Sequence, residues 1–210
     1  LAARLPPHTL MQRAGLAIAK LAIAIAPHAK TIWVVCGPGN NGGDGLEAAM
    51  HLHNWAIQNG RSNQTQTIVV TWLGDESRCP SDALASLQRA RSAGVHFAER
   101  APEHCDLAID ALLGIGGGQK PLSGKMVQHL QHMYAHAGSI LCVDLPSGLD
   151  ADTGRYAEST NDHYVNKINA INKIAPQAIY TPARGQKDHV FCLSLLTLKP
   201  GLFTAQGKDA

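Results

Sequence analysis

Three segments of the chain combine several glycines with carboxylate, amide or hydroxyl side chains. Residues 37–45 read Gly-Pro-Gly-Asn-Asn-Gly-Gly-Asp-Gly, residues 110–120 run from an aspartate through four glycines to a lysine, and residues 143–154 hold Asp144 and Ser147. Glycines let a backbone approach a ligand closely, and side-chain oxygens suit a hard cation or a sugar hydroxyl. A partly desolvated carboxylate can transfer protons. Together the segments predict a site for a polar ligand with acid–base chemistry.

Each segment also has a purely structural interpretation. Residues 37–45 could form a turn and helix cap, Asp110 and Asp144 could cap loops, and Asx turns explain Asp150 and Asp152. The first segment matches neither Gly-x-Gly-x-x-Gly nor the Walker signature, and the strand before Asp75 carries only a weak match to a ribose-binding acid. An ordinary nucleotide-dependent dehydrogenase is therefore the weaker alternative.

Apolar, β-branched runs alternate with helical patterns along the chain. This alternation is typical of βαβ units, and it predicts a three-layer, Rossmann-like α/β fold with a mostly parallel central sheet flanked by helices. Ligands bind at the carboxyl ends of such strands, where all three segments fall. The predicted strands are 31–36, 67–73, 106–110, 140–144 and 191–198, with another near 178–181; the predicted helices are 10–26, 45–58, 81–92 (Ser81 as N-cap) and 123–134.

Length and composition narrow the class of protein. The 210 residues suit a single domain (1–210), and the net charge of +2 with scattered Lys and Arg gives no support to nucleic-acid binding. The apolar stretch 16–27 is too short to span a membrane. Five cysteines without a Cys-x-x-Cys pair favour free thiols in a cytoplasm. The first residue is not Met, so we expect a fragment of a longer chain; residues 155–187 look like an irregular excursion or insertion.

At these motifs the chain resembles the YjeF N-terminal family, the NAD(P)HX epimerases. The matching strings are residues 37–45, 110–116 and 143–154, together with Leu-Met-Gln-Arg-Ala-Gly (10–15) and Leu-Lys-Pro-Gly (198–201). The resemblance covers most of the chain in the right order. One string departs: where the family has Ala-Asp-x-Thr entering the last strand, this chain has His-Val-Phe-Cys (189–192), so no role is assigned within 155–187.

The resemblance implies a potassium ion and a set of site residues. The ion would be held by Asn41, Asp110 and Ser147. The resemblance also implies a partner, an ADP- or ATP-dependent dehydratase, which is fused to this domain or separate. The apolar helix 10–26 suggests a possible homodimer. The hydrated nucleotide would be bound by Asn40, Asn41, Gly42, Gly43, Asp44, Gly114, Ile115, Gly116, Gly117, Gly118, Gln119, Lys120 and Asp144.

The implied reaction is epimerisation at C6 of hydrated NADH and NADPH, from the R to the S form. C6 must become planar: the ring nitrogen expels the hydroxyl to leave an iminium, and water returns to the other face. Asp144 is the expected acid–base catalyst, and Lys199 the expected assistant unless it is a surface lysine at a strand end. The alternative is a non-catalytic nucleotide- or protein-binding module, which would have lost these motifs.

Overall fold

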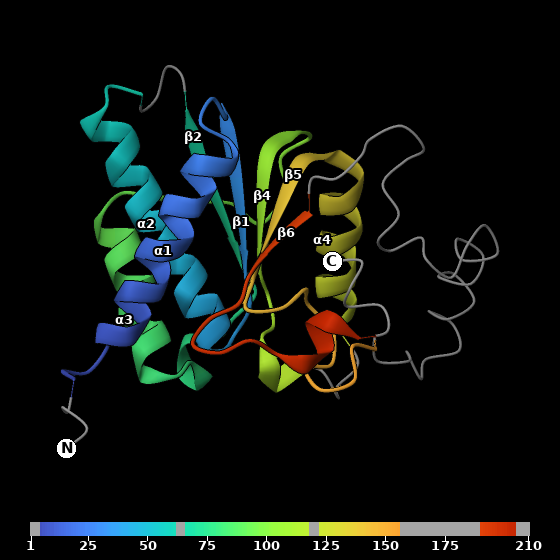
Figure 1. Cartoon of the computed structure of the whole chain (residues 1–210). Helices are drawn as coiled ribbons and strands as arrows, with labels where there is room; N and C mark the ends of the chain where they lie inside the picture. Colours follow the sequence, from blue (N-terminus) through green and yellow to red (C-terminus); the bar gives the residue numbers. More distant parts are fainter. Residues whose placement is uncertain (1–4, 62–65, 118–121, 156–189, 205–210) are drawn as a thin grey trace.

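A single parallel sheet forms the centre of the domain in the computed structural model, which describes residues 5–61, 66–117, 122–155 and 190–204 (Figure 1). Its strand order is β3-β2-β1-β4-β5-β6, and every pair of neighbours is parallel. The predicted α/β class is therefore confirmed. The strands are β1 (Thr31–Cys36), β2 (Thr67–Trp72), β3 (His96–Phe97), β4 (Cys105–Ala111), β5 (Ala137–Val143) and β6 (Val190–Leu193).

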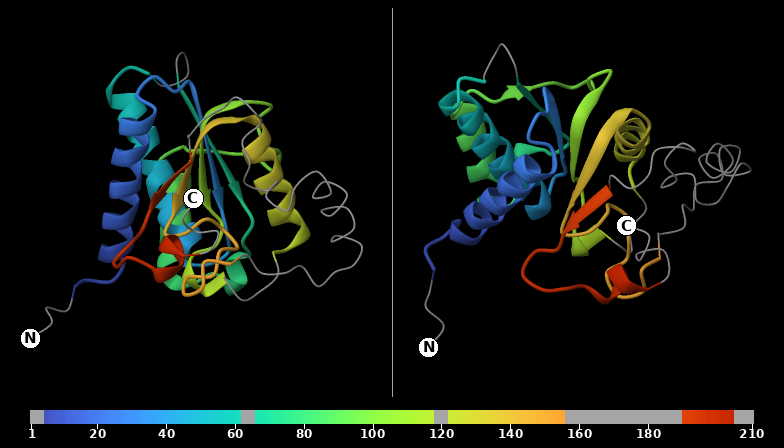
Figure 2. Two further views of the ribbon diagram at one scale, coloured as in Figure 1. Left: turned by 45° about the vertical axis from the view of Figure 1, so that its right-hand side comes forward. Right: turned by 45° about the horizontal axis from the view of Figure 1, so that its top comes forward.

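Helices cover both faces of the sheet, which gives three layers. Helices α1 (Thr9–Ile25), α2 (Asn40–Gln58) and α3 (Ser81–Ser92) lie on one face, and α4 (Gly124–His136) lies on the other (Figure 2). Because successive side chains of a strand point to opposite faces, β1 contributes Ile32 and Val34 to the core under α1–α3 and Trp33 to the core under α4. Short 3-10 turns follow at η1 (Glu76–Arg78), η2 (Ile115–Gly117) and η3 (Pro200–Phe203).

Most predicted elements agree with the structure to within a few residues, and three differences matter. Helix α2 begins at Asn40, not at residue 45, so the first glycine-rich segment is largely helical. The last strand ends at Leu193 instead of continuing to residue 198, because the chain turns back at Leu196, whose φ is 63°. Ser81 is the first helical residue and Pro80 occupies the cap, so the predicted N-cap is wrong.

Some predictions lie beyond what the structure describes. The strand near 178–181 and nearly all of the 155–187 excursion fall outside the described residues. Within the described part of the chain, no helix is both long and apolar enough to cross a membrane. The five cysteines are free thiols.

Candidate functional site

The second and third motif segments meet through Asp110 and Ser147. Asp110 lies near the end of β4 and is fully buried. The Ser147 hydroxyl donates to Asp110 Oδ1 at 2.6 Å, and the Ser147 amide donates to Oδ2 at 2.9 Å. The Leu113 amide in turn donates to Ser147 Oγ at 2.9 Å. Residues 37 positions apart in sequence are thus fixed side by side at the carboxyl edge of the sheet.

The first segment contributes the N-terminal turns of α2. Asn40, Asn41, Gly42, Gly43 and Asp44 are all helical, so the unpaired amides and positive dipole end of α2 lie at the site.

The glycines of this segment also have a packing role that the sequence did not predict. A Cβ atom on Gly42 would lie 2.0 Å from the carbonyl oxygen of Gly37, and one on Gly37 would lie 1.8 Å from that of Leu112. Real Cβ atoms do not approach so closely, so Gly42 allows α2 to pack directly on the loop after β1, and Gly37 allows that loop to pack on the segment after β4. Close backbone packing, not only ligand approach, explains the composition of residues 37–45.

Gly114 marks the point where all three segments converge. A Cβ atom there would lie 2.9 Å from Asp144 Oδ2 and 3.2 Å from Asn41 Oδ1. The amide nitrogen of Asn41 is buried and has no hydrogen-bond partner among the described residues. The predicted metal-binding and catalytic residues therefore share one small volume.

Asp144 is held in a strained conformation directly after β5. Its φ is 70°, in the left-handed region that costs a non-glycine residue energy and is retained when the surroundings enforce it. Its amide donates to the Leu193 carbonyl of β6 at 2.8 Å, and its Oδ2 accepts from the Ile115 amide at 3.3 Å. With 8% of its surface exposed, the carboxylate is fixed from both neighbouring segments.

Lys199 forms a buried ion pair with Asp144. The loop after β6 returns the lysine to the site, where its ammonium group contacts Asp144 Oδ1, the Leu195 carbonyl and, at 3.2 Å, Ser194 Oγ. The Leu195 amide also donates to Asp144 Oδ1 at 3.3 Å. Lys199 is 7% exposed, so the alternative of a surface lysine is wrong. Sequence reasoning missed Ser194 and Leu195, whose types signal nothing about this role.

The site contains carboxyl groups in contrasting surroundings. Burial, followed by the charges of Asp144 and Glu47, raises the pKa of Asp44 to about 7. Burial also raises the pKa of Asp110, although hydrogen bonds from Ser147 and Leu112 oppose this effect. Asp44, predicted only as a binding residue, can therefore exchange a proton near neutral pH.

The remaining predicted residues fall in several places. Ile115, Gly116 and Gly117 form η2 after β4, whereas residues 118–120, predicted to bind the nucleotide (Gly118, Gln119 and Lys120), lie outside the described residues. Asp150 Oδ1 accepts from Thr153 and Asp152 amides, at 2.8 and 3.2 Å, which is the Asx turn expected as its structural alternative.

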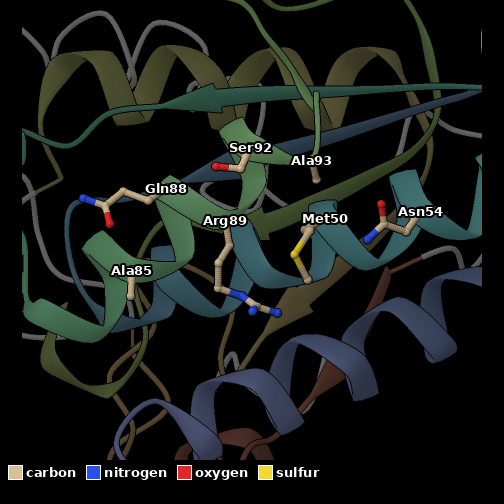
Figure 3. Close-up of a pocket in the computed structure, with 7 residues that line it drawn as sticks. All are labelled: Met50, Asn54, Ala85, Gln88, Arg89, Ser92 and Ala93. Carbon is tan, nitrogen blue, oxygen red and sulfur yellow. The ribbon is translucent and has the colours of Figure 1, made fainter.

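An open groove lies elsewhere, between α2 and α3 (Figure 3). Its volume is about 570 Å³. None of its lining residues belongs to the three motif segments, and only Arg89 carries a charge. The groove is lined by Met50, Asn54, Ala85, Gln88, Arg89, Ser92 and Ala93.

The fold and site together define a Rossmann-like α/β domain with a polar-ligand site at the carboxyl edge of its sheet. A family model described as "YjeF-related protein N-terminus" matches residues 7–179. The chain belongs to this family, as its motifs predicted. A solved structure, "Crystal structure of yeast ynu0, YNL200c", shares the fold with a TM-score of 0.59 and 22% identity, over 75% of this chain and 68% of the yeast chain.

Curated relatives carry informative names. The chain is 33% identical over 207 residues to the "Bifunctional NAD(P)H-hydrate repair enzyme Nnr" of Escherichia coli K12, covering 96% of this chain and 33% of that protein. It is 32% identical over 193 residues to the "NAD(P)H-hydrate epimerase" of Bordetella pertussis (strain Tohama I), covering 91% of this chain and 80% of the relative. The chain thus spans about a third of the E. coli protein's length.

Proposed function

We propose that this domain is an NAD(P)H-hydrate epimerase, an isomerase that interconverts the C6 epimers of hydrated NADH and NADPH. Membership of the family and the names of the relatives support this function. The structural observation that carries it is the buried Asp144–Lys199 pair at the point where three motif segments converge. A binding module without chemistry has no need of a strained, desolvated carboxylate at that point.

The chemistry requires one proton to be delivered and one to be removed at the C6 oxygen. The ring nitrogen lone pair forms the iminium while the C6 hydroxyl takes a proton and leaves as water. Water then adds to the opposite face of C6 and gives up a proton, which restores the neutral hydrate. Asp144 would take the proton from the returning water and its negative charge would stabilise the iminium, while Lys199 fixes its orientation. Asp44, whose pKa is raised to about 7, would give the proton to the departing hydroxyl. General acid–base catalysis is worth about 10²–10⁴-fold.

The N-terminal turns of α2 would bind the nucleotide's phosphates. Their free amides and dipole favour an anion, and the side-chain amides of Asn40 and Asn41 belong to the first turn. The η2 turn that follows β4 would close the other side of the ligand.

The donor set of Asn41, Asp110 and Ser147 fits a potassium ion. It comprises a buried carboxylate, a hydroxyl and an amide group whose nitrogen is unpaired among the described residues, and hard cations prefer such oxygen ligands. Groups of three or more His, Cys, Asp or Glu suited to a metal are absent from the described part of the chain. Potassium would neutralise Asp110 and order the two loops. We expect a higher melting temperature in KCl than in choline chloride, and no such difference for Asp110→Asn.

The central experiment couples this protein to a dehydratase that consumes only the S form. Purified protein is incubated with mixed R and S hydrated NADH, potassium and the dehydratase, and recovery of NADH absorbance is followed. We expect complete conversion, whereas the dehydratase alone stalls once the S form is consumed. A stall at the same level with folded protein would reject the epimerase and leave the binding-module alternative.

The partner and cell compartment follow from the same reaction. The bifunctional relatives support a dehydratase as the enzyme that consumes the S epimer, fused to this domain or separate. We propose that the pair acts in the cytoplasm, where reduced nicotinamide nucleotides are used, and that two copies could pair through α1.

A further inference from the structure

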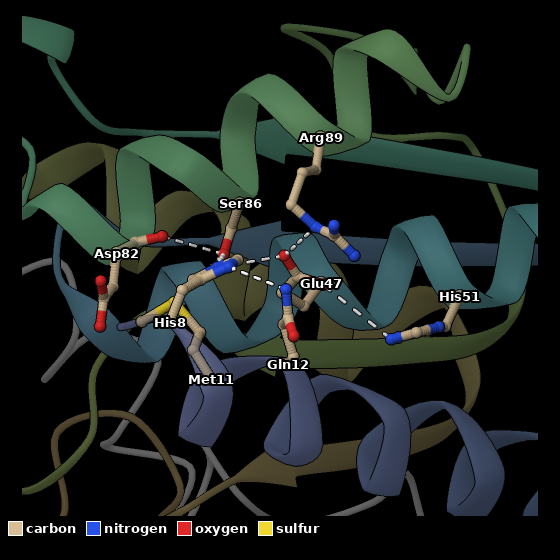
Figure 4. A network of polar contacts seen from close by, with 8 residues as sticks. All are labelled: His8, Met11, Gln12, Glu47, His51, Asp82, Ser86 and Arg89. Atoms are coloured by element: carbon tan, nitrogen blue, oxygen red, sulfur yellow. Dashed lines mark hydrogen bonds and ion pairs between the residues drawn. The ribbon is translucent and has the colours of Figure 1, made fainter. Parts of the chain in front are cut away.

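A cluster of charged and polar side chains joins α1, α2 and α3 (Figure 4). Its centre is Glu47, which is fully buried and follows Asp44 by one helical turn. Arg89 of α3 donates from Nε to Glu47 Oε1 at 2.8 Å, and His8 Nε2, next to the start of α1, lies 3.2 Å from the same oxygen. His8 Nε2 also lies 2.9 Å from Ser86 Oγ. The cluster therefore ties α1, α2 and α3 together.

The second oxygen of Glu47 has no comparable partner. Glu47 Oε2 and His51 Nε2 are both buried without a hydrogen bond among the described residues, and they lie 3.9 Å apart. Burying a carboxylate with an incomplete set of partners costs stability, and an apolar residue of similar size often serves packing equally well. Packing alone gives no reason for a carboxyl group at this position.

Helix packing transmits the position of Glu47 to the first turns of α2. A Cβ atom on Gly15 of α1 would lie 2.2 Å from Glu47 Cβ, and one on Gly43 would lie 2.6 Å from Met11 Sδ. The two helices are thus in direct contact on both sides of Asp44. Any shift of α1 relative to α2 would move the segment that holds Asn40 to Asp44.

We propose that Glu47 is a positioning residue of the candidate site, which acts on the reaction through Asp44. This inference rests on the proposed epimerase function. Residues three apart on a helix are neighbours on its surface, so Asp44 and Glu47 occupy adjacent positions on one face of α2. Glu47 makes no contact with the substrate in this scheme.

The charge of Glu47 has a second effect, on the pKa of Asp44, which a residue with a purely structural role would not have. After burial and the charge of Asp144, the charge of Glu47 is a further cause of the raised pKa of Asp44. The charged and titratable groups around the pair come from every adjoining element: His8 by α1, His51 on α2, Arg89 on α3, and Asp144 after β5. A protonated Asp44 can supply the proton that the departing C6 hydroxyl needs.

The test is the pH profile of Glu47→Gln. Glutamine keeps the shape and one acceptor, and Arg89, with 42% of its side chain exposed, remains solvated. Without the negative charge, the pKa of Asp44 falls. We expect the alkaline limb of the kcat profile to move by about one unit to lower pH, so that kcat drops about tenfold at pH 8 and stays near wild type at pH 5, with KM little changed. Glu47→Met, which removes the charge with an apolar chain of similar length, should give the same shift.

Glu76→Gln is the matched control. It removes an equal charge from an exposed ion pair with Arg91, at 2.7 Å on the surface of α3, and should leave the profile unchanged. A uniform loss of kcat at every pH in the Glu47 variants, or an unmoved profile, would overturn the proposal. NMR titration of the Asp44 carboxyl in wild type and Glu47→Gln needs no substrate. It therefore tests the Glu47–Asp44 coupling even if the wild type proves not to be an epimerase.

Discussion

Replacing Lys199 with methionine tests how strongly the site depends on its ion pair. The change removes the ammonium group and keeps the length of the side chain. Among the described residues, Asp144 would then keep two amide donors, Ile115 and Leu195, both at 3.3 Å. Removing one partner of a buried pair costs about 3–5 kcal/mol. The side chains of Lys199 and Asp144 are 9% and 12% exposed, so water can partly solvate the charge that remains. We therefore expect the free energy of unfolding to fall by about 2–3 kcal/mol.

A double-mutant cycle separates the pair from the general effect of substitution. Asp144→Asn removes the other charge, and asparagine tolerates the left-handed backbone that residue 144 adopts. The double variant should be more stable than the sum of the single effects by about 1–2 kcal/mol, because neither charge is left alone. Urea unfolding at pH 7, followed by tryptophan fluorescence, measures each corner. Lys125→Met, an exposed lysine of α4, is the control and should change stability by under about 0.5 kcal/mol.

Additive single effects would refute the argument, since uncoupled residues cannot form an energetically meaningful ion pair. The Asp144 variant also tests the catalytic role of this carboxyl group. Asp144→Asn should lower kcat by about 10²–10⁴-fold while the protein stays folded. A full rate in that variant would show that another group exchanges the protons.

Three further outcomes follow from the structure. Gly114→Ala should reduce epimerase kcat/KM at least about tenfold, because the new Cβ would lie 2.9 Å from Asp144 Oδ2; its urea midpoint should change little. The pKa of Asp44 in the folded protein, about 7, exceeds the ordinary 3.8 of an aspartate side chain, so its ionisation destabilises the fold increasingly between those pH values. Asp44→Asn should be more stable than wild type by about 1–2 kcal/mol at pH 8 and equal to it at pH 3, by urea titration. Cys79 and Cys192 are the two partly exposed thiols. Cys79 should react first with a thiol reagent, because burial raises the pKa of Cys192 to about 12.

The sheet was predictable because its strands are buried on both faces. Parallel strands covered by helices read as continuous apolar runs, and residues 31–36 form β1 with the predicted bounds. The edge strand β3 has two residues, His96 and Phe97, and carries no such run. The start of α2 was missed for another reason: glycines and asparagines are poor helix formers, and the tertiary packing of Gly42 against Gly37 and of Gly43 against Met11 cannot be read from the sequence.

The place of the site was predictable, but many of the contacts between its side chains were not. The rule that ligands bind at the carboxyl ends of parallel strands brings Asp110 and Asp144 together without any knowledge of side chains. The contacts of Lys199 with Asp144 join residues 55 positions apart. The turn at Leu196 that makes these contacts possible contains no glycine from which it could have been predicted. Glu47 gave no signal either, because a glutamate inside a helix is usually solvated.

Contacts within the protein itself hold the site residues in place. Asp144 is fixed by β6 and η2, Asp110 by Ser147, and the start of α2 by glycine contacts so close that no side chain fits. Its two proton-exchanging candidates differ in surroundings: Asp144 has a cation in contact, whereas Asp44 has two negative groups nearby. Carboxyl groups in such contrasting environments can divide the acid and base roles of one reaction between them. An epimerase needs that division, because the proton given to the departing hydroxyl and the one taken from the returning water lie on opposite faces of C6.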